Sequence, residues 1–289
     1  MRFDVEAGAL AWSAATGLLV AVAGRGVCAV DPQGRIKGWL EAVAGDALRC
    51  VTAIAVAADG AVYVTDGSRH NTADRWLQDL MENRPPSGRL IRCDADLGNA
   101  TVIFDGLNWP GGAALTQDER GVLVTEAWAH RLRRFDRAGG EPRMLIKNFT
   151  GYPSRIARGA SGGYWIAFFA LRTQLTEFVL REKEFRNRMM ANVPPHLWIG
   201  PSLGGSFDYR EPNQIGRIKK LGIQKPWAPP RSYGLVARLD DEGNVLESFH
   251  SRTSGRFHGV TAVISDRDRV LVASKGHGRL AALSPNAAA

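Results

Sequence analysis

Short apolar segments separated by turns rich in glycine and aspartate recur along the whole chain. One unit repeats: a small-residue entry, an alternating apolar segment, a turn such as Asp-x-Gly, a second apolar segment, and a segment that starts with Arg-Leu or Arg-Val and ends in Asp. Five copies can be counted, starting at residues 8, 51, 109, 152 and 258. Short strands joined by tight turns and repeated about every 40 residues are typical of propeller blades. The pattern therefore predicts an all-β fold, a β-propeller.

The ends of the chain bear on how such a ring would close. Segments such as LLVAV (18–22) and RVLVA (269–273) are apolar nearly throughout, which predicts strands covered on both faces by neighbouring blades. The last copy is too short for an outer strand. Because an open ring leaves an unpaired edge, we expect RFDVE (2–6) to supply that strand and residues 1–289 to form a single propeller domain.

Two insertions, at about residues 69–87 and 171–232, interrupt the repeats. Residues 72–83 carry Trp76, Leu77, Leu80 and Met81 at helical spacing, and residues 173–192 also form an amphipathic helical pattern that ends before a Pro-Pro pair. Residues 196–232 are rich in Pro, Gly and Trp and predict a long ordered loop. We expect both helical insertions on one face of the ring, as a lid over its channel.

Charge and cysteine content narrow the functional classes. The net charge is +8, but the basic residues are spread out or alternate, as at Arg131 and Arg133, which is typical of the solvated face of an edge strand. We therefore expect no nucleic-acid partner. No apolar segment reaches the roughly 18 residues of a membrane span, and residues 1–13 show no signal-peptide pattern. The three cysteines at positions 28, 50 and 93 lie in apolar segments without metal spacing, so a buried role and a soluble, cytoplasmic location are expected.

Three segments resemble the strictosidine synthase-like family, which is related to the gluconolactonase and paraoxonase propellers. They are VTDGSRHNTADRWLQDLMENRPPSGRLIRCD (64–94), TEAWAHRLRRF (125–135) and GYPSRIARGASGGYWIAF (151–168), in the family's order. The resemblance implies six blades, whereas five repeats are countable here. The copy that starts at residue 8 is similar to the family's second blade. Either this chain closes with five blades or the natural N-terminus is longer or divergent.

The same resemblance shows which family chemistry this chain lacks. The catalytic glutamate of the plant synthase falls at about Thr261, so a Pictet–Spengler synthase is disfavoured. The positions that hold calcium in related lactonases carry Thr52, Gly111 and the pair Ser154–Arg155. Calcium requires several oxygen ligands, some of them charged. We therefore expect no metal, no calcium site and no other cofactor.

Polar residues at the starts of inner strands are the candidate site residues. His258 suits proton transfer, but a histidine held in a turn is an equally good interpretation. Arg155 could bind a carboxylate or phosphate, or could instead form a salt bridge with an acid such as Glu126. No Gly-x-Ser-x-Gly elbow supports serine catalysis. The candidate catalytic residues are His258, Glu126 and Tyr152, and the candidate substrate-binding residues are Arg155, His70, Asn108, Trp109, Phe168 and Thr261.

Glu126, Tyr152 and the aromatic residues all have structural alternatives in blade geometry and core packing. The function that these residues predict is that of a small-molecule enzyme, a metal-independent hydrolase of the lactonase or esterase type that acts in the channel. The alternative is that this chain is a non-catalytic propeller. It would then bind a small molecule, anionic or aromatic, or would itself serve as an accessory protein. The sequence does not identify a protein partner.

Overall fold

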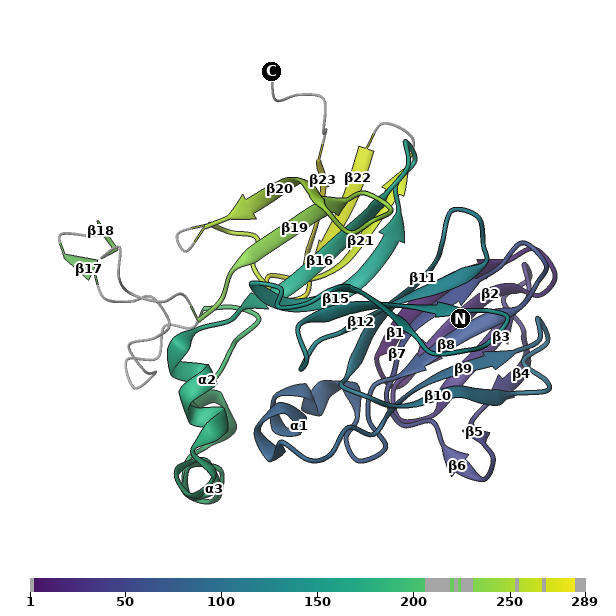
Figure 1. Ribbon diagram of the computed structural model, residues 1–289. Coiled ribbons are helices and arrows are strands. Elements are labelled where there is room, and N and C mark those ends of the chain that lie inside the picture. The colour runs from purple at the N-terminus through teal and green to yellow at the C-terminus, as the bar shows by residue number, and fades with distance from the viewer. Residues whose placement is uncertain are drawn as a thin grey trace.

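The described strands build five blades around a centre, and Figure 1 shows their arrangement in the computed structural model. The structure describes residues 3–205, 219–220, 223–224, 231–252, 255–266 and 269–283. Blade 1 consists of β1 (Ala7–Ser13), β2 (Gly17–Val22), β3 (Gly26–Val30) and β4 (Ile36–Leu40). Blade 2 consists of β7 (Val51–Val56), β8 (Val62–Asp66), β9 (Gly88–Cys93) and β10 (Thr101–Leu107). Blade 3 consists of β11 (Pro110–Leu115), β12 (Gly121–Glu126), β13 (Arg131–Asp136) and β14 (Arg143–Ile146).

The last two blades lie in the C-terminal half. Blade 4 consists of β15 (Gly151–Arg158), β16 (Tyr164–Leu171), β19 (Gly234–Leu239) and β20 (Val245–Ser251). Blade 5 consists of β21 (Val260–Asp266), β22 (Arg269–Ser274) and β23 (Arg279–Leu283). Two short hairpins complete the strands: β5 (Ala42–Val43) with β6 (Asp46–Ala47), and β17 (Lys219–Lys220) with β18 (Ile223–Gln224). The propeller and its five countable repeats are thus confirmed.

Tight antiparallel turns make the blades possible. In blade 1, Ser13 pairs with Gly17, which has φ of 93°, a left-handed value that glycine adopts without strain. A Cβ at Gly17 would also clash with the carbonyl oxygen of Val30 on β3. The repeated glycines of the sequence therefore mark positions where strands turn and approach closely.

Hydrophobic clusters join successive blades. Val27 and Ile54 belong to the cluster between blades 1 and 2, and Tyr63 and Val124 to the cluster between blades 2 and 3. Ile156 and Leu123 belong to the cluster between blades 3 and 4, and a similar cluster joins blades 4 and 5. Strands buried on both faces explain the nearly continuous apolar segments of the sequence.

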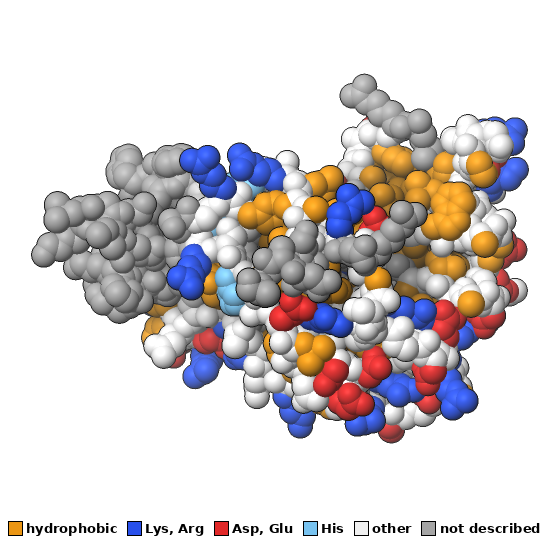
Figure 2. Space-filling model, turned by 90° about the horizontal axis from the view of Figure 1, so that it is seen from above, with side chains coloured by type: hydrophobic (Ala, Val, Ile, Leu, Met, Phe, Trp, Pro, Cys, Tyr) orange, Lys and Arg blue, Asp and Glu red, His pale blue; other side chains and the backbone are white. Residues whose placement is uncertain are grey.

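The side between blade 5 and blade 1 differs from the other four interfaces. In the described part of the chain no hydrophobic cluster joins these two blades, and Trp12 on β1 and Leu280 on β23 are 64% and 85% exposed. Hydrophobic side chains open to solvent are visible from above in Figure 2. The expected closure by residues 2–6 is wrong for the described residues 3–6, which form no strand, and β23 is the outermost described strand of blade 5.

Blade 1 itself holds the N-terminal segment. Phe3 packs against the face of blade 1 that carries Val20 and Cys28, and the carbonyl of Glu6 accepts a hydrogen bond from the backbone of Ala23 at 3.0 Å. The apolar contact of Phe3 thus draws the segment to its own blade. The ion pair between Glu6 and Lys275 connects the segment to the turn after β22.

The helical insertions cover one end of the ring. Residues 72–83 form a short 3-10 turn, η1 (Ala73–Arg75), and α1 (Trp76–Glu82), as predicted. The single helix expected over 173–192 is instead two, α2 (Gln174–Arg181) and α3 (Lys183–Asn192), because Glu182 at φ −83° and ψ 77° leaves the helical conformation. The Thr173 hydroxyl caps α2 by accepting from the backbone N–H of Thr176 at 3.2 Å.

After the helices, η2 (Pro195–Leu197) begins the long loop, most of which lies outside the described residues. A hydrophobic cluster packs α1, α2 and α3 on the ends of the blades; its members include Met81, Val179, Met189, Trp109 and Phe169. The cysteines at 28, 50 and 93 are buried and free, as predicted. In the part of the chain that the structure describes, no helix has both the length and the apolar character needed to cross a membrane.

Candidate functional site

A cavity of about 440 Å³ lies at the inner strands of all five blades. We call it the central cavity. Thr52, Gly111, Ser154 and Thr261, near the starts of β7, β11, β15 and β21, contribute to its wall. The inner-strand starts that the sequence singled out therefore do converge on one space. Its volume is in the range of pockets that hold small organic molecules.

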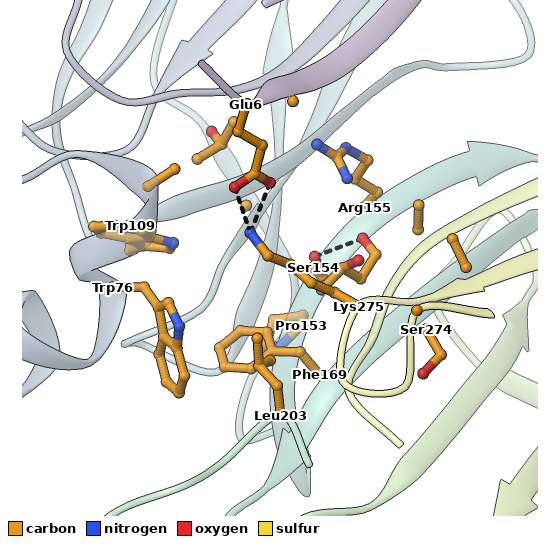
Figure 3. Close-up of a pocket in the computed structure, with 18 of the residues that line it drawn as sticks. Glu6, Trp76, Trp109, Pro153, Ser154, Arg155, Phe169, Leu203, Ser274 and Lys275 are labelled. Atoms are coloured by element: carbon orange, nitrogen blue, oxygen red, sulfur yellow. Dashed lines mark hydrogen bonds and ion pairs between the residues drawn. The ribbon is translucent and has the colours of Figure 1, made fainter. Parts of the chain in front are cut away.

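One end of the central cavity carries charges (Figure 3). The Lys275 ammonium donates to both carboxylate oxygens of Glu6, at 2.7 and 3.0 Å. Arg155 lies beside this pair, and no described residue offers its guanidinium a hydrogen bond or an ion pair; its Nε is buried without a partner. Burial lowers the pKa of Arg155 from its ordinary value, and the nearby negative charge of Glu6 acts in the opposite direction. An arginine remains protonated at neutral pH despite such a shift.

Three of the four hydroxyl side chains in the described wall of the central cavity, those of Thr52, Ser154 and Ser274, are engaged within the protein. Thr52 Oγ1 hydrogen-bonds the Pro110 carbonyl and lies 2.9 Å from Thr65 Oγ1. Ser154 donates to the Thr261 carbonyl at 2.8 Å. Ser274 donates to a further backbone carbonyl, that of residue 258. With their protons committed to backbone oxygens, these hydroxyls lack the adjacent base that nucleophilic catalysis requires.

The other end of the central cavity is aromatic. Trp76 from α1 and Phe169 from β16 meet edge to face with ring centroids 5.3 Å apart, and Trp109 stands beside them (Figure 3). Leu203 and Pro153 are among the other apolar residues of the wall. The central cavity therefore combines an apolar, flat-walled end with a charged end.

The residues present do not fit a calcium ion. In the described residues no group of three or more His, Cys, Asp or Glu side chains could hold a metal. Among the residues that line the central cavity, Glu6 supplies the one carboxylate and is paired with Lys275, while Gly111 has no side chain and Arg155 is cationic. Calcium needs a shell of oxygen ligands, some of them anionic.

The side chain of His258 does not line the central cavity, although its backbone carbonyl accepts from the lining residue Ser274. Its side chain is buried, with Nδ1 2.9 Å from the Ser232 hydroxyl and Nε2 2.8 Å from the Arg252 carbonyl. Burial lowers its pKa, with the Arg252 carbonyl opposing that effect. Both ring nitrogens are thus engaged, which matches the interpretation of a histidine held in a turn.

Glu126 and Asn108 belong to one structural contact set. The fully buried Glu126 carboxylate accepts from Arg131 Nε and Nη2, both at 2.7 Å, and from Arg133 at 3.3 Å. It also accepts from the Asn108 backbone at 2.8 Å. Burial opposes ionisation, but these hydrogen bonds and charges together lower the pKa of Glu126. Glu126 therefore has its own arginine partners, and Arg155 is not one of them.

Tyr152 is fully buried in β15, with its hydroxyl unpartnered and its ring 4.5 Å from that of His130. Burial raises the pKa of Tyr152 well above the ordinary phenol value. Its hydroxyl does not reach the central cavity, whose wall in this strand begins at Pro153. The aromatic contacts place Tyr152 behind the aromatic wall, in a packing position.

The remaining candidates divide between the central cavity and other places. Thr261 and Trp109 line it, whereas His70 lines a smaller cavity of about 90 Å³ beneath α1, which Asn108 and Trp109 also reach. Phe168 packs in the interblade core against Phe149, and its neighbour Phe169 lines the central cavity. The sequence-based choice of Phe168 was therefore off by one residue. Successive side chains in a strand point to opposite faces, so this shift moves the candidate from the cavity to the interblade core.

Sequence reasoning missed Glu6, Lys275, Trp76 and Leu203 as wall residues. Trp76 was visible only as part of a helical stripe, which fits core packing equally well. Glu6 lies in a segment expected to form a strand, and Lys275 lies in a turn without a distinctive motif. Their meeting depends on how blade 5 approaches blade 1, which no local pattern encodes.

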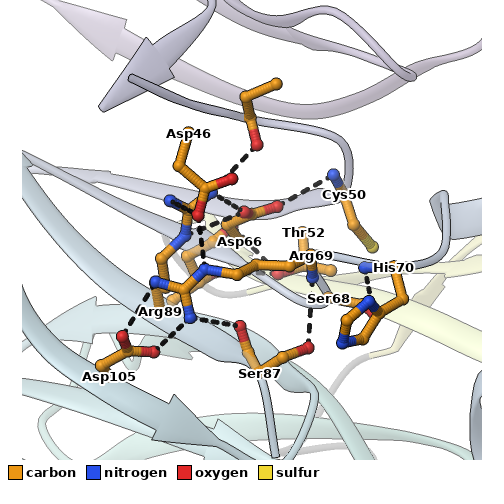
Figure 4. Close-up of polar contacts among 12 residues, drawn as sticks. Asp46, Cys50, Thr52, Asp66, Ser68, Arg69, His70, Ser87, Arg89 and Asp105 are labelled. Atoms are coloured by element: carbon orange, nitrogen blue, oxygen red, sulfur yellow. Dashed lines mark hydrogen bonds and ion pairs between the residues drawn. The ribbon is translucent and has the colours of Figure 1, made fainter. Parts of the chain in front are cut away.

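A second buried charge cluster lies in blade 2 (Figure 4). The fully buried Arg89 of β9 donates to Asp66 at 2.5 and 3.2 Å, to Asp46 at 3.1 Å and to the Ala47 carbonyl at 3.0 Å. Asp66 also accepts from the Cys50 backbone at 2.9 Å. Burial raises the pKa of Asp66, although its hydrogen bonds to Arg89 oppose the shift. Every group in this cluster is satisfied within the protein, which indicates a structural role.

Comparisons with known proteins agree with the fold and the motifs. The family model described as strictosidine synthase matches residues 52–138. Adipocyte plasma membrane-associated protein of Danio rerio is 34% identical over 241 residues, which cover 81% of this chain and 52% of that protein. Strictosidine synthase-like 13 of Arabidopsis thaliana is 26% identical over 258 residues, 87% of this chain and 55% of that protein. The chain thus spans about half the length of these relatives.

Solved structures extend the likeness in fold. A gluconolactonase from Xanthomonas campestris superposes with a TM-score of 0.59 at 16% identity and covers 96% of this chain and 71% of that one. A putative gluconolactonase superposes with a TM-score of 0.60 at 12% identity and covers 99% of this chain and 76% of that one. At these identities the likeness shows the fold alone.

Proposed function

We propose that this chain, a strictosidine synthase-like β-propeller, binds a small organic anion in its central cavity and recognises it with Arg155. One observation carries the proposal: the guanidinium of Arg155 lines the cavity, yet no described residue provides an acceptor for it. The Arg155 side chain is half-buried, and a charge that is partly removed from water without a partner is costly to the folded protein. An anionic ligand that accepts from Arg155 would remove that cost.

The charge balance of the cavity supports an anion. Its described lining holds three cationic side chains, Arg155, Lys275 and Arg279, against the carboxylate of Glu6. Low-dielectric walls strengthen the field of such an excess charge. A guanidinium can donate two parallel hydrogen bonds to a carboxylate, which favours this anion over a spherical one.

The test is calorimetric titration of wild type and Arg155→Ala with a small carboxylate such as propionate. We expect the substitution to weaken binding by about 1.5–3 kcal/mol, the range for hydrogen bonds to charged groups. Arg143→Ala is the matched control, since Arg143 is exposed on the outer strand β14. Equal propionate affinity in wild type and Arg155→Ala would contradict the proposal.

Replacing Glu6 should change the affinity for an anion in the opposite direction to replacing Arg155. Its carboxylate is the nearest negative charge to Arg155 and competes electrostatically with an incoming anion. We therefore expect Glu6→Gln to bind propionate more tightly than wild type. A weaker affinity would mean that Glu6 organises the site rather than competing for it.

Hydrolysis of a lactone or ester is the second candidate, and the pair of Glu6 and Lys275 next to Arg155 favours it. In such a reaction the Glu6 carboxylate would take a proton from water as the water attacks the carbonyl carbon. Arg155 would stabilise the negative oxygen that develops on the carbonyl. The carbonyl would then re-form as the bond to the alkoxide oxygen breaks, and the protonated Glu6 would give its proton to that departing oxygen. Solved propellers that are named gluconolactonases share this fold.

A lactone and nitrophenyl ester panel tests this candidate. We expect Glu6→Gln to abolish turnover and His258→Ala, whose side chain does not line the cavity, to retain it. The opposite pattern, with turnover lost only in His258→Ala, would transfer the catalytic role to His258. No turnover in wild type would leave binding alone as the function.

A further inference from the structure

The apolar end of the central cavity is a preorganised aromatic wall. Trp109 lies at its edge with φ of 53°, a left-handed value that bulky residues rarely adopt. Trp128 packs on Trp109 with centroids 5.0 Å apart and is itself held by a 2.9 Å hydrogen bond to Asp79. A strained backbone kept in place by such contacts is a feature of ligand sites.

No described residue uses the indole N–H group of either tryptophan that lines this wall. In the described part of the chain, the indole N–H groups of Trp76 and Trp109 have no hydrogen-bond acceptor, whereas Trp128 and Trp198 both have one. Figure 3 shows Trp76, Trp109 and Phe169 turned toward the same space, with the charged end opposite. The wall thus presents flat aromatic surface and polar ring edges to whatever enters.

The polar lining argues against a sugar-like ligand. A polyol needs many free hydrogen-bonding partners, but three of the four hydroxyl side chains in the described lining, those of Thr52, Ser154 and Ser274, already donate to backbone carbonyls. Hydroxyl groups that lose water without gaining partners would weaken binding by more than stacking restores. A ligand with few hydroxyls and one charged end matches the lining better.

We propose that the ligand is an aromatic carboxylate, with its ring against Trp76, Trp109 and Phe169 and its carboxylate on Arg155. This inference rests on the proposed anion site and adds that the part of the ligand beyond its carboxylate is an aromatic ring. Offset or edge-to-face contact with the wall contributes beyond the buried area. Arg155 and the aromatic wall together fix the ligand's orientation, ring toward α1 and carboxylate toward β1 and β15.

The experiment is calorimetric titration of wild type with 3-phenylpropionate, 3-phenylpropionamide, 3-cyclohexylpropionate, propionate and gluconate. We expect 3-phenylpropionate to bind at least about tenfold more tightly than propionate, because the ring buries apolar area and meets aromatic partners. We also expect it to bind more tightly than the neutral amide, the cyclohexyl acid and gluconate.

Variants separate the two ends of the site. Arg155→Ala should reduce the affinity for both phenylpropionate and propionate, whereas Phe169→Leu and Trp76→Leu should reduce only the advantage of phenylpropionate. Trp39→Leu in the outer strand β4 is the matched tryptophan control. Melting curves identify any variant that fails to fold, and Trp76→Phe then replaces Trp76→Leu as the milder change.

The failures are distinguishable. If propionate binds through Arg155 but phenylpropionate binds no better, the aromatic inference is overturned and the anion site stands. If the amide binds as well as the acid and Arg155→Ala has no effect, the anion site is overturned. Preferred binding of gluconate, or equal binding of the cyclohexyl acid, also overturns the aromatic assignment.

Discussion

Arg89 in blade 2 and Arg155 in blade 4 both place a guanidinium inside the propeller, but in opposite circumstances. Arg89 is fully buried and donates to two carboxylates and a backbone carbonyl (Figure 4). Arg155 faces the central cavity with no acceptor from a described residue (Figure 3). Within the Arg89 cluster, the ion pairs and hydrogen bonds offset the free-energy cost of removing its charges from water. No described residue does the same for Arg155, and this difference separates a structural charge from a binding charge.

The difference also lies in how the two residues reach their surroundings. Arg89 pairs with Asp66 directly across β8 and β9, in register within one sheet. The short β5–β6 hairpin adds Asp46 from the adjoining loop. Arg155 instead lies among the innermost strands, where five blades contribute to one wall and no single sheet surrounds it. Local pairing satisfies the first arginine, while the architecture of the ring isolates the second.

Removing Arg89 should have the largest effect on stability. Arg89→Ala leaves Asp66 buried without its partner, and breaking a buried ion pair from one side costs about 3–5 kcal/mol. Urea unfolding of wild type and variant measures the loss. Arg92→Ala on the same strand is the control and should change stability by less than about 0.5 kcal/mol. A loss under about 1 kcal/mol for Arg89→Ala would mean that the cluster does not hold blade 2 together.

The buried side chain of His130 should make the stability of the folded protein depend on pH in the acid range. Burial lowers the pKa of His130 to about 4, with Arg172 adding to the shift and the Gly151 carbonyl and Glu177 opposing it. The ordinary histidine pKa is about 6.5, so between these values the unfolded chain binds the proton that the folded protein refuses. Stability is then present above pH 6.5 and falls as the pH drops from 6.5 to 4, by about 3 kcal/mol in all.

The variant His130→Asn removes this proton linkage and retains a residue type that tolerates the left-handed backbone at position 130. Its free energy of unfolding should depend less on pH between 6.5 and 4 than that of wild type. His70→Asn, on the exposed loop after β8, serves as the control. Parallel pH profiles for wild type and His130→Asn would contradict the assignment to His130.

Replacing Arg155 should have little effect on the free energy of unfolding, in contrast to replacing Arg89. Arg155→Met keeps most of the side-chain volume and removes a charge for which the described residues offer no partner, so the stability should stay within about 1 kcal/mol of wild type or rise. Urea unfolding without ligand measures this, in the same buffer as for Arg89→Ala. A loss comparable to that of Arg89→Ala would show that Arg155 has a structural partner, and the comparison between the two arginines would collapse.

The sequence could predict the blades and the helices of the insertions, because turns, alternation and helical spacing are local properties. It also located Arg155 and Thr261 at the cavity wall, since inner-strand starts converge in any propeller. It could not predict the pairing of Glu6 with Lys275, which depends on residues far apart in the chain that meet between blades 5 and 1. The strand expected at residues 2–6 was wrong for residues 3–6 because Phe3 packs on blade 1 instead.

The smallest expected effect is that of calcium, which should leave the melting temperature unchanged. The cavity wall offers a cation the Glu6 carboxylate, already paired with Lys275, and places Arg155 beside it. A site with a dissociation constant one hundredth of the calcium concentration would stabilise the folded protein by about 2.7 kcal/mol, which a melting curve resolves. Melting curves in 10 mM calcium, in chelator and in magnesium at equal ionic strength provide the measurement. A rise specific to calcium that chelator reverses would mean that an oxygen-rich site exists despite the substitutions at the inner-strand starts, and the cavity's preference for anions would then need a different explanation.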